Sequence, residues 1–132
     1  MDLHSVRHIV MDMPIINPRE FSEKWIAAWN AHDLEGVLAH YTAEAVVHTP
    51  LSAVRVPGSN GIVRGQNALR DYWGEAIQEN SDLHFELVET MATVDGATIL
   101  YRNHRGQLVA ETVLWGEDGL VHSAFVAYGS SR

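Results

Sequence analysis

Four apolar segments in the second half of the chain limit the possible folds more than any other feature. Asp95-Gly96 and Asp118-Gly119 separate two pairs of these segments, and Asp-Gly between apolar runs is a strong signal for a tight β-hairpin. A third turn is predicted at Arg105-Gly106. The pattern therefore predicts a four-stranded antiparallel meander, with strands at 84–94, 97–103, 107–115 and 120–128.

The first half of the chain shows helical periodicity instead. Pro18 suits the first turn of a helix predicted at 19–32, and Asp33 can cap a second helix at 34–42. A third helix is predicted at 66–80. The apolar faces of these helices consist of Phe21, Trp25, Ala28, Trp29 and His32; of Leu34, Val37, Leu38 and Tyr41; and of Leu69, Tyr72, Trp73, Ala76 and Ile77.

A short strand is predicted at 45–50, where β-branched residues run into Pro50, which cannot donate to a sheet. Residues 51–65 are rich in glycine and proline, which predicts a loop. Helices followed by a meander indicate an α+β fold. We predict one cone-shaped domain at 18–132, in which three N-terminal helices pack in the concave face of a curved, mainly antiparallel sheet and leave an apolar pocket.

Length and charge narrow the possible functions. A chain of 132 residues with 20% charged residues fits a single globular domain. Its net charge of −8 disfavours nucleic acid and anionic membranes as partners. Residues 1–17 contain no apolar run long enough for a secretory signal. We therefore expect a cytoplasmic protein with an N-terminal arm at 1–17 that packs on its own domain or on a partner subunit.

Common cofactor and nucleophile motifs do not match. The segment 58–65 lacks the spacing of a phosphate-binding loop, and no serine-nucleophile elbow is present. His4 and His8 are spaced as a metal pair on a helix would be, but a third ligand is not evident. The chain has no cysteine. We expect neither a metal nor another cofactor.

Glu111 is the strongest candidate for chemistry. Strand alternation places it on one face with Val109, Val113 and Trp115. If that face lines the cone, burial raises the pKa of the carboxyl, which can then donate a proton near neutral pH. The alternative is an outer face on which Glu111 is paired with a basic side chain.

Two histidines are candidate partners for Glu111. His48 lies next to Thr49, and Val47 and Thr49 share one strand face while His48 takes the other. Which of His48 and Thr49 faces the cavity depends on a register that the sequence leaves open. His122 shares its face with Tyr128 on the last strand. An imidazole suits general base catalysis near pH 7, although a histidine in a strand is often structural.

The aromatic residues are numerous, and most are expected to form the core. Buried indole N–H and phenol O–H groups need partners, so some are expected to face a wet pocket. Together with two polar residues at strand ends, the candidate pocket residues are Trp25, Trp29, Tyr41, Thr49, Trp73, Tyr101, Asn103 and Tyr128.

Three segments carry a family resemblance: WIAAWNAHDLEGVLAHYTAEAVVHTP at 25–50, GIVRGQNALRDYW at 61–73 and EDGLVHSAFVAYG at 117–129. They resemble the nuclear transport factor 2-like superfamily of α+β cones, especially its SnoaL-like branch and the steroid Δ-isomerases. The resemblance covers about residues 18–129. It is specific for the fold and weak for function, because the superfamily includes isomerases, cyclases, dehydratases, epoxide hydrolases and binding or transport modules.

The resemblance to the isomerases implies roles for three positions. Their oxyanion-hole tyrosine falls at Trp25, their catalytic aspartate at Thr49 and their protonated aspartate at Glu111. Glu111 can inherit its counterpart's role, whereas Thr49 cannot abstract a proton and the Trp25 N–H is a weaker donor. We therefore do not expect true steroid isomerisation.

Two hypotheses remain from the sequence. The first is a cofactor-free acid–base enzyme, namely an isomerase, cyclase, dehydratase or hydrolase, that binds a small hydrophobic molecule and uses Glu111. The second is a non-catalytic ligand-binding or dimerisation module with the same fold. Homodimers are common in families that resemble this one, often through the outer face of the sheet.

Overall fold

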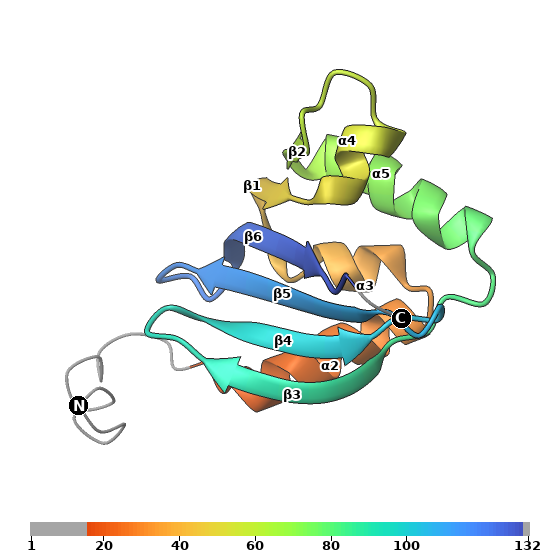
Figure 1. Cartoon of the computed structure of the whole chain (residues 1–132). Coiled ribbons are helices and arrows are strands. Elements are labelled where there is room, and N and C mark those ends of the chain that lie inside the picture. The colour runs from red at the N-terminus through yellow and green to blue at the C-terminus, as the bar shows by residue number, and fades with distance from the viewer. Residues whose placement is uncertain (1–15, 131–132) are drawn as a thin grey trace.

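The computed structural model describes residues 16–130, which form four helices and one six-stranded sheet (Figure 1). This arrangement confirms the predicted α+β class with a curved, mainly antiparallel sheet. Residues 1–15 of the predicted arm, including His4 and His8, lie outside the described residues.

The sheet has the strand order β2-β1-β6-β5-β4-β3. Strands β3 (Glu86–Ala92), β4 (Gly96–Arg102), β5 (Leu108–Trp115) and β6 (Val121–Tyr128) form the predicted antiparallel meander. Strand β1 (Tyr41–His48) pairs in parallel with β6 and carries the short edge strand β2 (Ile62–Arg64). After β1 the chain forms helices and β2, and then continues in the same sheet at β3.

Two helices begin as the sequence predicts. Helix α2 (Pro18–Asn30) has Asn17 as its N-cap, whose side chain accepts a hydrogen bond from the backbone N–H of Glu20. Helix α5 (Gln66–Glu79) matches the predicted third helix to within one residue. Helix α2 packs on β3 and β4 and lies behind the sheet in Figure 1. Its buried face consists of Phe21, Ser22, Trp25, Ile26 and Trp29.

The second predicted helix is much shorter than expected. Helix α3 (Leu34–Leu38) ends before Tyr41, which starts β1 and pairs with Val121 of β6. At Tyr41 the pairing with β6 determines the local structure, although the sequence has helical periodicity there. Gly36 lies inside α3 and lets the carboxylate of the N-cap Asp33 approach closely, because a Cβ there would lie 2.4 Å from that carboxylate.

The predicted loop at 51–65 contains two elements that the sequence did not indicate. Helix α4 (Pro50–Arg55) has Thr49 at its N-cap position and Pro50 in its first turn. Strand β2 has only three residues and forms because β1 offers a free edge. Within residues 16–130, none of the helices is sufficiently long and apolar to span a bilayer.

Candidate functional site

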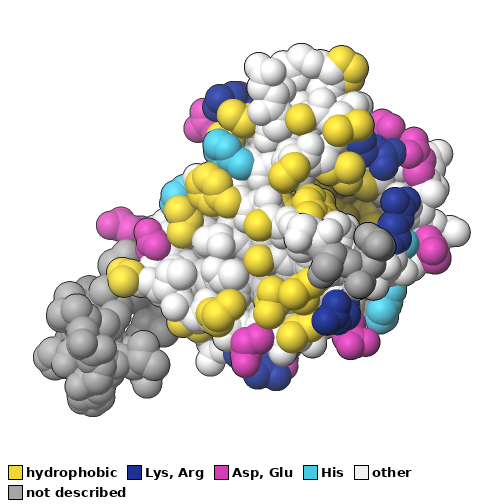
Figure 2. All heavy atoms as spheres, viewed as in Figure 1, with side chains coloured by type: hydrophobic (Ala, Val, Ile, Leu, Met, Phe, Trp, Pro, Cys, Tyr) yellow, Lys and Arg dark blue, Asp and Glu magenta, His cyan; other side chains and the backbone are white. Residues whose placement is uncertain are grey.

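A cavity of about 450 Å³ opens between the helices and the concave face of the sheet. Its interior is apolar, and Figure 2 shows hydrophobic side chains inside a hollow. Helices α2, α4 and α5 contribute to its wall, together with strands β1, β4, β5 and β6 and the β4–β5 hairpin. The apolar lining consists of Trp25, Trp29, Val47, Pro50, Leu51, Val54, Trp73, Ala76, Leu83, Phe85, Val109 and Val126.

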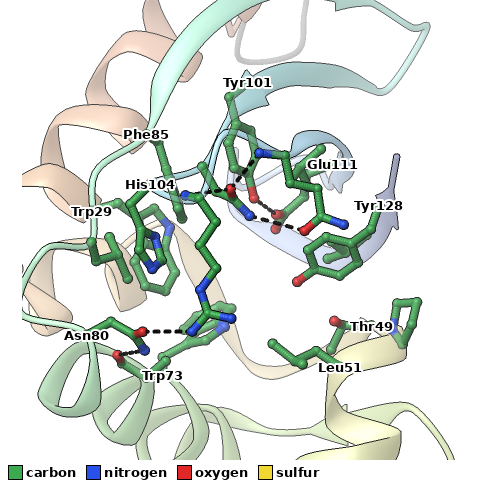
Figure 3. Close-up of a pocket in the computed structure, with 18 of the residues that line it drawn as sticks. Trp29, Thr49, Leu51, Trp73, Asn80, Phe85, Tyr101, His104, Glu111 and Tyr128 are labelled. Carbon is green, nitrogen blue, oxygen red and sulfur yellow. Dashed lines mark hydrogen bonds between the residues drawn. The ribbon is translucent and has the colours of Figure 1, made fainter. Parts of the chain in front are cut away.

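Glu111 is the acidic residue among the described residues that line this cavity. Its side chain is 5% exposed, and the phenol of Tyr101 on the neighbouring strand donates a hydrogen bond to its Oε1 at 3.2 Å (Figure 3). Burial raises the pKa of Glu111 to about 7, and the hydrogen bond from Tyr101 opposes this rise. A carboxyl with a pKa near neutral pH is well suited to general acid–base catalysis.

Aromatic hydroxyl groups surround the carboxyl. Tyr72, Tyr101 and Tyr128 line the cavity with Glu111. Burial raises the pKa of all three phenols, that of Tyr128 to about 12, and the nearby Glu111 carboxyl adds to each rise. These groups therefore remain protonated at neutral pH. Because Tyr101 already donates its O–H to Glu111, Tyr72 and Tyr128 are the phenols that can donate a hydrogen bond to a ligand. Thr49 is buried beside Tyr128 (Figure 3) and adds a fourth hydroxyl.

The tryptophans shape the cavity without filling it. Trp29 packs edge-on against Trp73, with ring centroids 5.5 Å apart, and the two rings line the cavity together with Trp25. The Nε1–H of Trp29 is buried and has no hydrogen-bond partner among the described residues. Trp25 donates its Nε1–H to the hydroxyl of Tyr41 at 2.9 Å. Tyr41, a predicted pocket residue, is therefore a buried support behind the wall and not part of the lining.

His48 does not face the cavity. Strand β1 turns Val47 and Thr49 inward, with exposures of 1% and 4%, so His48 points to the outer face of the sheet. Its ring stacks on Phe125 of β6, with centroids 4.6 Å apart. The register that the sequence left open therefore favours Thr49 as the cavity residue.

His122 also lies outside the cavity, because a β-bulge breaks the alternation of β6. Leu114 pairs with Ser123 and Trp115 pairs with Val121, which leaves His122 as an extra, unpaired residue. Its side chain is exposed and contacts the hydroxyl of Ser123. Neither predicted histidine can act as the partner of Glu111 in this arrangement.

The sequence reasoning missed an imidazole and a cation that do line the cavity. His104 and Arg105 lie in the β4–β5 hairpin, directly after Asn103, a predicted pocket residue that also lines the cavity. The Asn103 side chain accepts hydrogen bonds from the backbone N–H groups of Arg105 and Gln107, both at 3.0 Å, and so fixes the turn. The signal in the sequence was the run of polar residues that follows the end of β4. In Figure 3, His104 lies near Trp29, whereas Glu111 lies near Tyr101.

Within residues 16–130 no group of three or more histidine or acidic side chains is placed to hold a metal ion. The arrangement offers an apolar cavity, one carboxyl with a raised pKa and several hydroxyl groups. Such a site can bind an apolar molecule, orient an oxygen atom by hydrogen bonds and exchange a proton at Glu111.

Residues 22–121 match the family model described as a SnoaL-like domain. Among solved structures, a SnoaL-like protein of unknown function from Burkholderia thailandensis is 37% identical, with a TM-score of 0.83 over 86% of this chain and 94% of that chain. None of the curated proteins matches the chain.

Two more distant structures show the fold alone. SalBIII, an epoxide hydrolase/cyclase-like enzyme of pyran ring formation in the polyether salinomycin, is 13% identical, with a TM-score of 0.65 over 86% of this chain and 91% of that chain. An NTF2-like protein of unknown function from Cytophaga hutchinsonii is 13% identical, with a TM-score of 0.62 over 88% of this chain and 93% of that chain.

Proposed function

Because this chain belongs to the SnoaL-like domain family, we propose that it binds a small hydrophobic molecule in its cone and transforms it by cofactor-free acid–base chemistry through Glu111. Family membership, which the sequence resemblance predicted, supports the fold but does not define a reaction. The proposed reaction is an isomerisation, cyclisation, dehydration or hydrolysis.

The observation that carries the proposal is the environment of Glu111. A buried carboxyl whose pKa is raised to about 7 costs folding free energy near neutral pH, and such groups cluster at functional sites. Tyr101 holds its Oε1 in place, and the surrounding phenols offer donors to an oxygen of the ligand. The activity named for SalBIII, which shares the fold, is consistent with acid–base chemistry in such a cone.

Binding in the cone is tested with the neutral fluorescent probe N-phenyl-1-naphthylamine. Ala76 lines the cavity from α5, so Ala76→Trp fills its volume, whereas Gln78 is exposed on the same helix and Gln78→Trp is the matched control. We expect Ala76→Trp to weaken binding of the probe at least tenfold and Gln78→Trp to leave it unchanged. Equal binding by wild type and both variants would mean that the probe binds elsewhere.

Acid–base chemistry is tested with a simple ketone in place of the natural substrate, by exchange of the α-protons of 1-tetralone in D₂O, followed by NMR. In this reaction the Glu111 carboxylate removes a proton from the carbon beside the carbonyl and a deuteron from solvent replaces it. We expect Glu111→Gln to lose at least 100-fold in exchange rate, because an amide cannot accept the proton, in line with the typical contribution of a general base of about 100- to 10,000-fold. Binding of the neutral probe should be nearly unchanged.

A non-catalytic ligand-binding module is the second candidate, and the outward orientation of His48 and His122 favours it. If the wild type binds 1-tetralone yet exchanges its protons no faster than Glu111→Gln, the protein is a binding module. We also propose that the protein forms a homodimer through the outer face of the sheet and is located in the cytoplasm.

A further inference from the structure

The β4–β5 hairpin places a cation at the mouth of the cavity without an acidic partner. Arg105 lines the cavity and its side chain is exposed. Its Nη2 lies 3.5 Å from the amide oxygen of Asn80, a long hydrogen bond to a neutral group that a dashed line marks in Figure 3. Among residues 16–130, Arg105 forms no ion pair with a carboxylate. Its charge is therefore available to a ligand.

The other charged groups of the lining are already balanced. Arg55 is paired with Glu79 and lies 3.9 Å from Glu75, so its charge is neutralised from outside the cavity. Glu111 is partly protonated near neutral pH. Arg105 therefore gives the mouth a positive charge, although the whole chain carries a net charge of −8. Figure 2 shows basic side chains at the edge of the apolar hollow.

A second side chain of the same hairpin has uncommitted hydrogen-bonding groups. His104 lines the cavity beside Arg105, and neither of its ring nitrogens has a hydrogen-bond partner among the described residues. Asn103 fixes the backbone of this turn through two hydrogen bonds. The hairpin therefore holds Arg105 and His104 at a defined place relative to the apolar interior.

We propose that the ligand of this cavity is a small apolar molecule bearing an anionic group, and that Arg105 binds this group at the mouth. The apolar body then lies against the tryptophans, within reach of the cone's polar groups. A guanidinium binds carboxylate-like groups through charge-assisted, often bidentate hydrogen bonds. Such bonds are stronger than the single long hydrogen bond that Arg105 donates to the neutral amide of Asn80. The inference rests on the proposed function, because it names the class of ligand for the same cavity.

The test compares two probes that differ in one charged group: 1-anilinonaphthalene-8-sulfonate, which is anionic, and N-phenyl-1-naphthylamine, which is neutral. Arg105→Gln removes the charge. Arg102→Gln is the matched control, because Arg102 belongs to the same hairpin region, bonds to the Gly106 carbonyl and does not line the cavity. We expect Arg105→Gln to weaken binding of the sulfonate roughly tenfold, the size of one exposed charge-assisted contact, and to leave the neutral probe unchanged. Arg105→Lys keeps the charge but loses the bidentate geometry, so it should bind the sulfonate more tightly than Arg105→Gln and less tightly than the wild type.

Three outcomes overturn the inference. If Arg105→Gln binds the sulfonate as tightly as the wild type, Arg105 does not bind the anionic group. If Arg105→Gln weakens both probes equally, Arg105 acts by packing and not by charge. If Arg102→Gln weakens the sulfonate as much as Arg105→Gln does, the general field of the surface is responsible. Failure of the neutral probe to bind the wild type would instead remove the proposed function, and the inference with it. Sulfonate binding that survives in Ala76→Trp is surface binding and is subtracted before the comparison.

Discussion

At the scale of single residues, strand alternation proved reliable only where the strand is regular. Glu111 lies in a stretch of β5 whose pairing with β4 is uninterrupted, so its face follows directly from the positions of Val109 and Val113. His122 lies at a bulge, and one extra residue reverses the face of every side chain on one side of it. Glu111 and His122 showed the same alternation in the sequence, yet Glu111 faces the cavity and His122 does not.

The buried carboxyl predicts how stability depends on pH. The folded protein holds the proton of Glu111 up to about pH 7, whereas the unfolded chain releases it near the ordinary value of 4.5. Because the folded state binds more protons in this window, the unfolding free energy falls as pH rises from about 4.5 to about 7, by at most roughly 3 kcal/mol.

Urea denaturation between pH 4.5 and 8 checks this expectation. Relative to wild type, Glu111→Gln should gain stability as pH rises through the window, because the amide has no proton to lose. Glu44 is exposed, so Glu44→Gln should follow the wild-type curve. A wild-type curve parallel to that of Glu111→Gln would show that the pKa of this carboxyl is not raised.

At the scale of elements, the hairpins and long helices formed where local signals agree with tertiary packing. Helix α3 and strand β1 show the opposite case, since Tyr41 continues a helical pattern but pairs with β6. Helix α4 and strand β2 have too few residues to leave a periodic pattern. Because Leu51 and Val54 of α4 line the cavity, the least predictable segment completes the site.

At Gly96, the backbones of β4 and β5 lie so close together that a side chain has no room. A Cβ at this position would lie 1.9 Å from the carbonyl oxygen of Val113, so Gly96→Ala forces the two strands apart. We expect a loss of about 1–3 kcal/mol of unfolding free energy, as for other overpacked sites. Gly116→Ala is the control, since its nearest contact is an ordinary 3.6 Å, and urea midpoints for both variants provide the measurement. Equal midpoints would contradict the expected clash.

At the scale of the whole molecule, the sheet has one face on the cavity and another that no helix within residues 16–130 covers. Phe125 is 43% exposed on β6 and stacks on His48. We propose that this outer face pairs with a second copy, so Phe125→Lys should convert a dimer to a monomer in light scattering coupled to size exclusion.

Val94, which is 83% exposed at the β3–β4 turn, provides the matched control for this substitution. Val94→Lys should stay dimeric, because a turn residue lies outside a sheet-to-sheet contact. A monomeric wild type, or a dimer that survives Phe125→Lys, would exclude this interface.

The sequence by itself determined the α+β class, the meander, the two long helices and the prominence of Glu111, because each depends on a local period or on a turn dipeptide. Only the tertiary structure decided that Thr49 and not His48 faces inward, that a bulge turns His122 outward, and that His104 and Arg105 reach the mouth. The physical reason is that the orientations of His48, Thr49 and His122 depend on strand register, and the place of His104 and Arg105 depends on contacts between segments far apart in the chain. A local pattern determines neither of these.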